Sequence, residues 1–386
     1  MTIPMSHEDE LLRDTVRSFF DDHVLPHEEA VDRLGEVPDE IGREIEARGR
    51  ELGLYAANLP ERVGGGGLNH TQMSIIEREF GRTSHALHSW IARPTELLMA
   101  CEGDQIEKYL LPCVSGEKRE LFGLTEPEAG SDAMGMKSNA KRDGGDWILN
   151  GMKHFISAPT MADFAIVFAA TGQDETPRGP RKRVTAFLVD RDMTGVTFRE
   201  GNKCVSNRGY KTYELIFDDV RLGPDQVLGE EGRGFELAGQ WLGMGRIWVG
   251  ATCCGKAERM MEMATDWAAT RKQFGKPIGS FQATGFRLAD MAISLRAADL
   301  MVWDAVRRAD ADDLRDEDAA MVKVFCSEML NKVADDTVQI YGGMGLMEEV
   351  PVQRMWRDSR IERIWDGTSE IQRHIVTRSI LRPLGA

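Results

Sequence analysis

The spacing of apolar residues changes twice along this chain of 386 residues, and that change limits the folds it can form. Near the N-terminus, Leu11, Leu12, Val16 and Phe19 recur at the spacing of a buried helix face. Between about residues 121 and 232, apolar residues instead alternate with polar ones and are rich in β-branched side chains, as in strands. From residue 233 the helical spacing returns. The order is therefore helices, then strands, then helices.

This order predicts an α+β chain of three domains, with limits at residues 1–120, 121–232 and 233–386. In the helical domains we expect helices over residues 71–81, 84–100, 234–270, 281–309, 317–341 and 369–381. In the middle domain we expect strands over residues 147–156, 164–170, 184–189, 196–199 and 213–217. Turn residues at 143–145 and 176–180 separate these strands, which predicts a compact β domain.

The composition excludes several classes of protein. The formal net charge is −15, whereas phosphate binding requires clustered Lys and Arg, so we expect no nucleic-acid partner. No apolar run has the length of a membrane span, and the first ten residues lack a signal-peptide pattern. The six cysteines form no CxxC pair, which predicts reduced thiols and a cytoplasmic location. His85 and His88 have no evident third ligand, so we expect exposed or capping histidines and no metal.

Two short segments carry residues suited to a ligand site. Residues 124–132 read Leu-Thr-Glu-Pro-Glu-Ala-Gly-Ser-Asp, so that Gly and Pro flank small polar residues. Backbone N–H groups and hydroxyls there can face a ligand, although a simple turn has a similar composition. Residues 364–372 read Ile-Trp-Asp-Gly-Thr-Ser-Glu-Ile-Gln. In this segment Asp366 can act as a general base or cap the following helix.

Both segments resemble signatures of the acyl-CoA dehydrogenase family, and the resemblance extends over nearly the whole chain. Residues 124–132 are similar to the signature that holds the pyrimidine edge of the flavin, and residues 364–372 to the segment that places the catalytic base. The resemblance implies a helical N-terminal domain, a middle β-barrel or β-sandwich and a C-terminal four-helix bundle. It also implies FAD as cofactor, an acyl-CoA substrate and electron-transferring flavoprotein as electron acceptor.

The resemblance places the flavin ring against the middle domain. Leu124 and Thr125 would contact the ring, with a hydrogen bond from Thr125. Phe155 and Ser157 stand where many members carry Trp-Ile-Thr. Phe155 would therefore stack on the isoalloxazine face, and Ser157 would bond near N5, because an aromatic face and a hydroxyl are both retained.

The remaining cofactor contacts are implied to come from a neighbouring subunit. Arg271 and Phe274 would lie at the flavin pyrophosphate, where a guanidinium suits phosphate. The turn that contains Gln339, Gly342 and Gly343 would meet the adenosine portion. A site built from two chains requires assembly, so the resemblance implies a homotetramer or homodimer.

The family normally carries glutamate as the base, whereas this chain has Asp366, whose carboxylate is one methylene shorter. By the resemblance, Asp366 abstracts the α-proton of the thioester while the β-hydrogen leaves as hydride to flavin N5. A shift of about 1.5 Å is large enough to lower the rate roughly 10²-fold. Gly367 would let the backbone approach the thioester closely, and the Trp365 side chain would form one wall of the site. Thr368 and Glu370 would contact the cofactor, and a cap from Thr368 would free Asp366.

Further residues are implied to contact the substrate. Ser131 would contact the thioester or the pantetheine arm, and Arg246 is retained on the long helix after residue 233. The family commonly has Asp where this chain has Gly243. Some relatives carry their base immediately before the arginine, and Gly245 at that position excludes this alternative.

The acyl group is indicated only in outline. The family places residues 84–100 beside the acyl tail, and His88, Trp90 and Arg93 are more polar or bulkier than a long-chain pocket requires. We therefore expect a short or polar acyl group. The same site could also run in the reverse direction, as an enoyl-CoA reductase.

Two other functions fit the same motifs. Nitroalkane oxidases share this fold, use Asp as base and react with oxygen, which matches Asp366. Alternatively, the chain is a non-catalytic subunit of a heteromeric dehydrogenase. The retained Arg271 and the Gly342–Gly343 turn argue against this second alternative, because a subunit without flavin would not need them.

Overall fold

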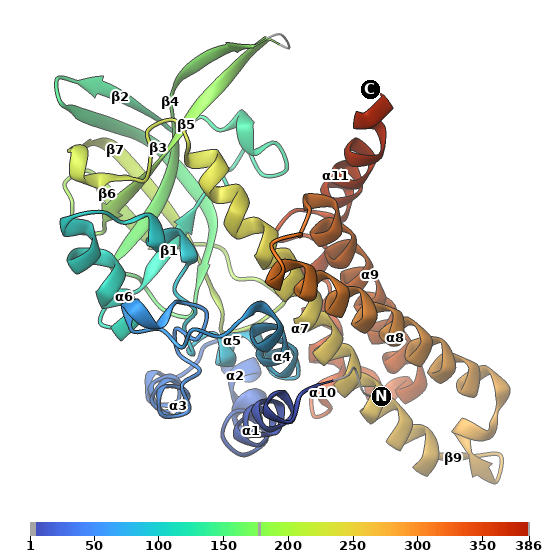
Figure 1. Cartoon of the computed structure of the whole chain (residues 1–386). Helices are drawn as coiled ribbons and strands as arrows, with labels where there is room; N and C mark the ends of the chain where they lie inside the picture. Colours follow the sequence, from blue (N-terminus) through green and yellow to red (C-terminus); the bar gives the residue numbers. More distant parts are fainter. Residues whose placement is uncertain (1–4, 177–178, 385–386) are drawn as a thin grey trace.

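The computed structural model describes residues 5–176 and 179–384, which form three regions in the predicted order (Figure 1). The chain begins with short helices, continues into a curved sheet and ends in long packed helices. The N-terminal helices are α1 (His7–His23), α2 (Glu28–Leu34), α3 (Asp39–Glu51), α4 (His70–Gly81), α5 (His85–His88) and α6 (Leu111–Ser115).

The predicted helix over residues 84–100 is wrong. Only the short α5 forms there, followed by a 3₁₀ helix over Glu96–Ala100. Pro94 has no backbone donor, and Thr95 is extended and starts the second helix, because its Oγ1 accepts a hydrogen bond from the N–H of Leu97 at 3.3 Å. The chain therefore turns at Pro94.

The middle region is one sheet in the order β6-β7-β3-β2-β4-β5-β8, with β1 parallel to β4. The strands are β1 (Glu120–Gly123), β2 (Asn139–Asp143), β3 (Asp146–Ala158), β4 (Phe164–Thr176), β5 (Gly179–Asp190), β6 (Val196–Glu200), β7 (Lys211–Leu222) and β8 (Val227–Leu228). The five predicted strands are confirmed, but β4, β5 and β7 extend further than predicted. In the predicted turn at 176–180, residues 177 and 178 lie outside the described residues.

The C-terminal region is a bundle of long helices, and all four helices predicted for it form within one residue of the expected limits. Its helices are α7 (Gly234–Thr270), α8 (Gln282–Asp310), α9 (Asp316–Tyr341), α10 (Pro351–Ser359) and α11 (Ser369–Leu381). A small hairpin, β9 (Lys272–Gln273) with β10 (Lys276–Pro277), joins α7 to α8. The domain limits at 120 and 232 stay a prediction. Within residues 5–176 and 179–384, no helix is long and apolar enough to cross a membrane.

Helices α4 and α7 approach closely because glycines stand at their contact. A Cβ atom on Gly255 would lie 1.7 Å from the carbonyl oxygen of Arg78. A Cβ atom on Gly81 would lie 2.0 Å from the carbonyl oxygen of Thr252. Real Cβ atoms do not approach this closely, so the packing of the N-terminal helices on the bundle requires glycine at both positions.

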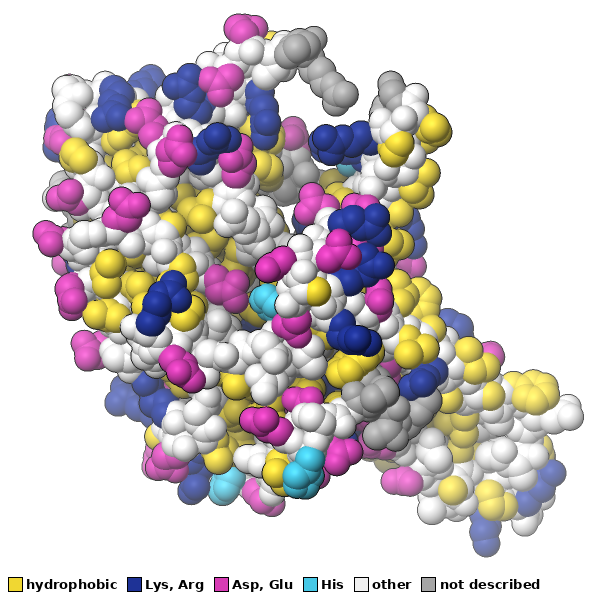
Figure 2. Space-filling view, in the orientation of Figure 1, with side chains coloured by type: hydrophobic (Ala, Val, Ile, Leu, Met, Phe, Trp, Pro, Cys, Tyr) yellow, Lys and Arg dark blue, Asp and Glu magenta, His cyan; other side chains and the backbone are white. Residues whose placement is uncertain are grey.

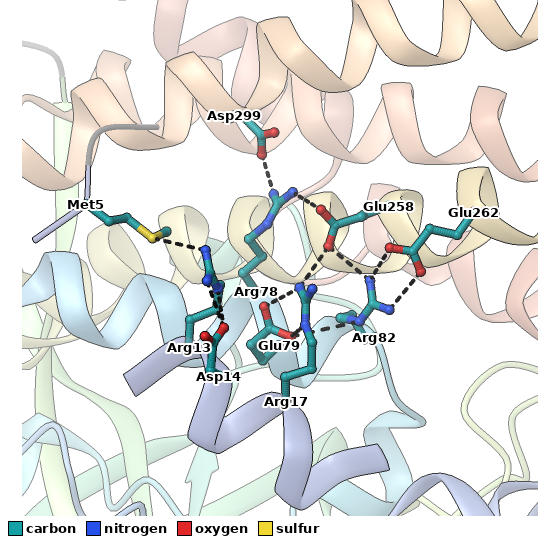
Figure 3. A network of polar contacts seen from close by, with 10 residues as sticks. All are labelled: Met5, Arg13, Asp14, Arg17, Arg78, Glu79, Arg82, Glu258, Glu262 and Asp299. Atoms are coloured by element: carbon teal, nitrogen blue, oxygen red, sulfur yellow. Dashed lines mark hydrogen bonds and ion pairs between the residues drawn. The ribbon is translucent and has the colours of Figure 1, made fainter. Parts of the chain in front are cut away.

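An ion-pair network surrounds this contact (Figure 3). Three arginines, from α1, α4 and the residue that follows α4, face carboxylates of α4, α7 and α8, and Glu258 of α7 accepts from all three. The pairs are Arg17–Glu79 at 2.8 Å, Arg17–Glu258 at 3.2 Å, Arg78–Glu258 at 3.1 Å, Arg82–Glu258 at 2.9 Å, Arg82–Glu262 at 2.8 Å, and Arg78–Asp299. The network thereby joins the N-terminal helices to the bundle.

Candidate active site

The two predicted flavin motifs of the middle region lie side by side. The backbone N–H of His154 in β3 donates to the carbonyl of Thr125 at 2.9 Å. Lys153 is completely buried, and its Nζ donates to the carbonyl of Leu124 at 3.1 Å and pairs with Glu126 at 2.8 Å. Burial lowers the pKa of Lys153 to about 8, against the attraction of Glu126. These contacts fix Thr125 against β3.

Phe155 lies in an irregular part of β3. The pairing of β3 with β7 shifts register between Lys153 and Ile156, and Phe155 there has a φ of 54°. A bulge re-aims the side chain of its strand, and the Phe155 ring is accordingly 62% exposed. Ser157 lies close by, with its Oγ 3.5 Å from the carbonyl oxygen of Phe155. An exposed aromatic ring at a strained position is typical of a ligand platform.

Asp366 and Gly367 form a left-handed turn before α11, with φ angles of 52° and 91°. The side-chain amide of Gln372 donates to both of their carbonyl oxygens at 3.0 Å. Lys323 of α9 donates to the carbonyl of Gly367 at 2.6 Å. The φ of 91° at Gly367 favours glycine, and a Cβ atom there would also lie 2.6 Å from the Gln372 amide nitrogen.

The interpretation of Asp366 as a helix cap is wrong. Thr368 caps α11, because its hydroxyl accepts a hydrogen bond from the N–H of Ile371 at 3.3 Å. Within the described part of the chain, no group donates a hydrogen bond to the Asp366 carboxylate and no cation lies within ion-pair distance of it. The carboxylate is therefore available to a ligand.

Charged groups surround Asp366 from several elements. Burial raises the pKa of the Asp366 carboxyl, opposed most strongly by Lys323 and less by Arg246 and Arg93, while Glu362 adds to the rise. Arg246, on α7, has a buried Nε with no hydrogen-bond partner in the described part of the chain, and burial lowers the pKa of Arg246. The site therefore holds a carboxylate and a guanidinium that are both incompletely satisfied.

Aromatic rings line the same region. The His85 ring lies 4.4 Å from Tyr210, 5.1 Å from Trp365 and 4.5 Å from His88, between ring centroids. The indole N–H of Trp365 donates to Glu362 at 2.7 Å, which fixes the ring beside Asp366. Burial lowers the pKa of His85 to about 3, so the ring is neutral.

The structure corrects two expectations about residues 84–100. His88 was expected to be exposed or capping, but it is buried against Phe80 and His85, because α5 is covered by its neighbours. Trp90 was expected beside the acyl tail, but its ring packs against Gly42 of α3 in the N-terminal core. Arg93 does lie near the site, because its charge acts to lower the pKa of Asp366. It also lies over the Trp248 ring and pairs with Glu77 at 2.9 Å. The described residues contain no group of ligands for a metal.

The remaining predicted cofactor residues lie at the far end of the bundle. Arg271 directly follows α7, and Phe274 in the β9–β10 hairpin is 93% exposed. The stacked rings of Trp267 and Tyr341, 4.7 Å apart, bring the end of α7 to the end of α9. The predicted residues Gln339, Gly342 and Gly343 are there, and Cβ atoms on the two glycines would meet no atom of the described residues within 4 Å. This end projects away from the sheet (Figure 1).

Two other predicted site residues, Ser131 and Glu370, make no contact that links them to Asp366 or Phe155 among the described residues. Ser131 and Glu370 are exposed, Ser131 in the loop after β1 and Glu370 in the first turn of α11. Lys323, Gln372 and Tyr210 also lie around the Asp366–Gly367 turn, and none of them was predicted as a site residue. The sequence does hold one indication of Lys323, because it is the single charged residue within an apolar stretch of α9. It holds none of Tyr210.

Comparisons with known proteins agree with this architecture. Three family models match, described as the acyl-CoA dehydrogenase N-terminal domain over residues 6–117, middle domain over 121–220 and C-terminal domain over 232–381. The chain is 34% identical over 382 residues to a 3-(aryl)acrylate reductase of Clostridium sporogenes, covering 98% of this chain and 99% of that protein.

It is also 34% identical over 383 residues to subunit CarC of the caffeyl-CoA reductase–Etf complex of Acetobacterium woodii, with 98% and 99% covered. Among solved structures, butyryl-CoA dehydrogenase of Megasphaera elsdenii matches with a TM-score of 0.87 and 32% identity, covering 99% of this chain and all of that one. The matched models together span nearly the whole chain. The chain belongs to the acyl-CoA dehydrogenase family, whose members are FAD-dependent oxidoreductases.

Proposed function

We propose that Asp366 is the base of this acyl-CoA dehydrogenase and removes the α-proton of an acyl-CoA thioester. The observation that carries the proposal is the carboxylate of Asp366 at a strained turn, with no hydrogen-bond donor among the described residues. A base for a carbon-bound proton needs a carboxylate free to reach it, and the raised pKa of Asp366 makes it a stronger base. FAD supplies the acceptor for the β-hydride.

The backbone of the same turn supports the proposal. In the described part of the chain, the N–H of Asp366 donates to no backbone or side-chain acceptor. It is therefore available to stabilise negative charge that develops on the thioester oxygen, which is a large contribution in reactions of this kind. Gly367 adds no side chain between the backbone and the substrate.

The middle region offers residues that fit FAD. Phe155 presents its exposed ring on the bulge of β3, Thr125 lies beside it, and Leu124 and Ser157 flank the pair. We propose that these residues hold the flavin ring, that Thr368 and Glu370 contact the cofactor from the start of α11, and that Ser131 and Arg246 contact the substrate.

The rest of the cofactor site is proposed to come from a second copy of the chain. Arg271, Phe274, Gln339, Gly342 and Gly343 of the partner subunit would bind the pyrophosphate and adenosine. In one chain they lie at the far end of the bundle from the sheet (Figure 1), so the chain cannot bring both sets together by itself.

An exposed apolar stripe on α8 supports this assembly. Phe286, Ile293 and Leu300 are seven residues apart, lie on one face of the helix and are 63%, 68% and 47% exposed. Figure 2 shows hydrophobic side chains on this projecting end of the bundle. Such a stripe is costly in water and is typical of a helix that packs against another chain. A homodimer or homotetramer follows from the proposal.

The comparisons support an identity for the electron acceptor and a direction for the reaction. The matched CarC protein is named as part of an Etf complex, which supports electron-transferring flavoprotein as the partner. Two matched relatives are named as reductases, so the reverse reaction is part of the proposal.

The groups around Asp366 favour a short or polar acyl group over a long aliphatic one. These groups are the rings of His85, Tyr210 and Trp365 and the charge of Arg93. A cytoplasmic location is supported by six free cysteines.

The test is anaerobic bleaching of the flavin by a panel of acyl-CoA thioesters of different length and polarity. We expect bleaching by at least one short or polar thioester. Asp366→Asn should slow bleaching by roughly 10³-fold or more while FAD stays bound. Bleaching of the Asn variant at the wild-type rate would place the base elsewhere. Asp366→Glu reports whether the pocket still accepts the longer arm.

The second candidate, a nitroalkane oxidase, is favoured only by the identity of Asp366. It is tested with nitroethane in air, where oxygen consumption would support it against the dehydrogenase. The third candidate, a non-catalytic subunit, predicts a colourless protein that FAD does not reconstitute. Binding of FAD with bleaching by a thioester excludes it.

A further inference from the structure

Lys323 is one of three buried lysines in the described chain, and it differs from the other two. Lys153 pairs with Glu126 at 2.8 Å, and Lys256 pairs with Glu362 at 2.9 Å. Lys323 is completely buried in α9, yet no carboxylate lies within ion-pair distance of it among the residues described. Burial of an unpaired ammonium is costly, so a lysine kept there solely for stability is hard to explain.

The contact that Lys323 does make is with the turn that carries the proposed base. Its Nζ donates to the carbonyl of Gly367 at 2.6 Å, one residue beyond Asp366. Asp366 is not a glycine and yet has a φ of 52°, a conformation that persists only where surrounding contacts enforce it. Lys323 and Gln372 supply those contacts from α9 and α11.

We propose that Lys323 is a positioning residue for Asp366: it anchors the Asp366–Gly367 turn and places a positive charge beside the carboxylate. This inference rests on the proposed role of Asp366. It assigns two separate effects to one ammonium, a hydrogen bond that fixes the direction of the base and a charge that keeps the base ionised in a partly desolvated site.

Other charged groups face Asp366, and they do not replace Lys323. Arg246 comes from α7, Arg93 from the loop after α5, and Glu362 from the segment before the turn. Among these, Lys323 exerts the largest attraction on the carboxylate. Tyr210 also lies near Asp366, and burial raises the pKa of its phenol, so it is neutral near pH 7.

Three substitutions separate the two effects. Lys323→Met removes both the charge and the hydrogen bond, Lys323→Gln retains a donor without charge, and Lys323→Arg retains the charge. The measurement is the pH profile of the rate of anaerobic bleaching by the best acyl-CoA, with FAD content and KM followed in parallel. A base must be ionised, so the rate rises with pH through the pKa of Asp366.

Loss of the cation should raise that pKa. In Lys323→Met and Lys323→Gln we expect the midpoint of the rising limb to move up by about 1 unit or more. The rate at pH 7 should fall roughly 10- to 100-fold, with a smaller change in KM. Lys323→Arg should return the midpoint toward the wild-type value. A purely structural lysine would instead change stability and leave the midpoint in place.

Lys332→Met is the matched control, because Lys332 is also on α9, is exposed and pairs with Asp336 at 2.6 Å. It should leave the profile unchanged. An unchanged midpoint in both Lys323→Met and Lys323→Gln, with Asp366→Asn inactive, would overturn this inference alone. Wild-type activity in Asp366→Asn would instead overturn the proposed function. If Lys323→Met fails to retain FAD, the Gln and Arg variants decide the matter.

Discussion

At the contact of α4 and α7, three partly buried arginines pair with carboxylates. Around the Asp366–Gly367 turn, by contrast, Asp366 lies near Lys323 and Arg246 but forms an ion pair with neither of them. Glu258 in the first region accepts from three arginines (Figure 3). Among the residues that the structure describes, Asp366 in the second region accepts from no arginine, and the buried Nε of Arg246 has no hydrogen-bond partner. Completed pairs hold two parts of a chain together, while incomplete ones leave binding capacity for a ligand.

The largest expected effect is the loss of the central carboxylate of the network. Burial opposes ionisation of Glu258, but the arginines lower its pKa overall, so its stabilising charge is present at neutral pH and is lost in acid. Glu258→Gln should lower the free energy of unfolding by about 3 kcal/mol, measured by urea denaturation at pH 7. Glu231→Gln, at an exposed pair with Arg142, should cost less than about 1 kcal/mol. Equal losses in the two variants would contradict the comparison.

A smaller effect is expected from the close contact of the helices. Gly255→Ala places a methyl group against the Arg78 carbonyl and should lower the free energy of unfolding by about 2 kcal/mol. Gly239→Ala, on the same helix with open space around its Cβ position, should raise it by about 0.5 kcal/mol or more. Thermal denaturation of the pair measures the difference, and a stabilised Gly255→Ala protein would show that the helices can separate.

The smallest effect is expected in the incomplete site. Because burial raises the pKa of Asp366, the folded protein favours the neutral carboxyl, and the ionised form is destabilising near pH 7. Asp366→Asn should therefore raise the free energy of unfolding by about 1 kcal/mol at pH 7, with asparagine also tolerating the positive φ. The difference should shrink as pH falls toward the raised pKa. A loss of stability in the variant would mean that the carboxylate is satisfied in the folded protein.

Much of the fold followed from local pattern. Helix α7 was predicted at residues 234–270 as observed, because its apolar spacing is long and uninterrupted. Strand β4 was predicted only to residue 170, because side chains beyond it are largely exposed and lose the apolar signal. Helix α10 was missed, since it is only nine residues long. The pattern of apolar residues predicts the buried part of a helix or strand and does not predict its exposed part.

The candidate site divides in the same way. Thr125, Phe155 and Asp366 lie in short motifs, so their sequence alone indicated them. Lys323 and Tyr210 reach Asp366 from distant segments, and no local spacing links them to it. The positive φ of Asp366 and of Phe155 was likewise hidden, because tertiary contacts impose it. Of the seven non-glycine residues with positive φ that the structure describes, three are predicted site residues: Phe155, Phe274 and Asp366.

The exposed Phe274 of the hairpin has a consequence for how the protein behaves at different concentrations. The Phe274 ring, in the β9–β10 hairpin, is 93% exposed, and the Phe155 ring, on β3 of the sheet, is 62% exposed. If one FAD molecule contacts both rings by bridging two copies of the chain, the fraction of sites that hold FAD depends on the protein concentration as well as on the FAD concentration. Dilution of the protein would then release bound FAD, and added FAD would favour association of the monomers.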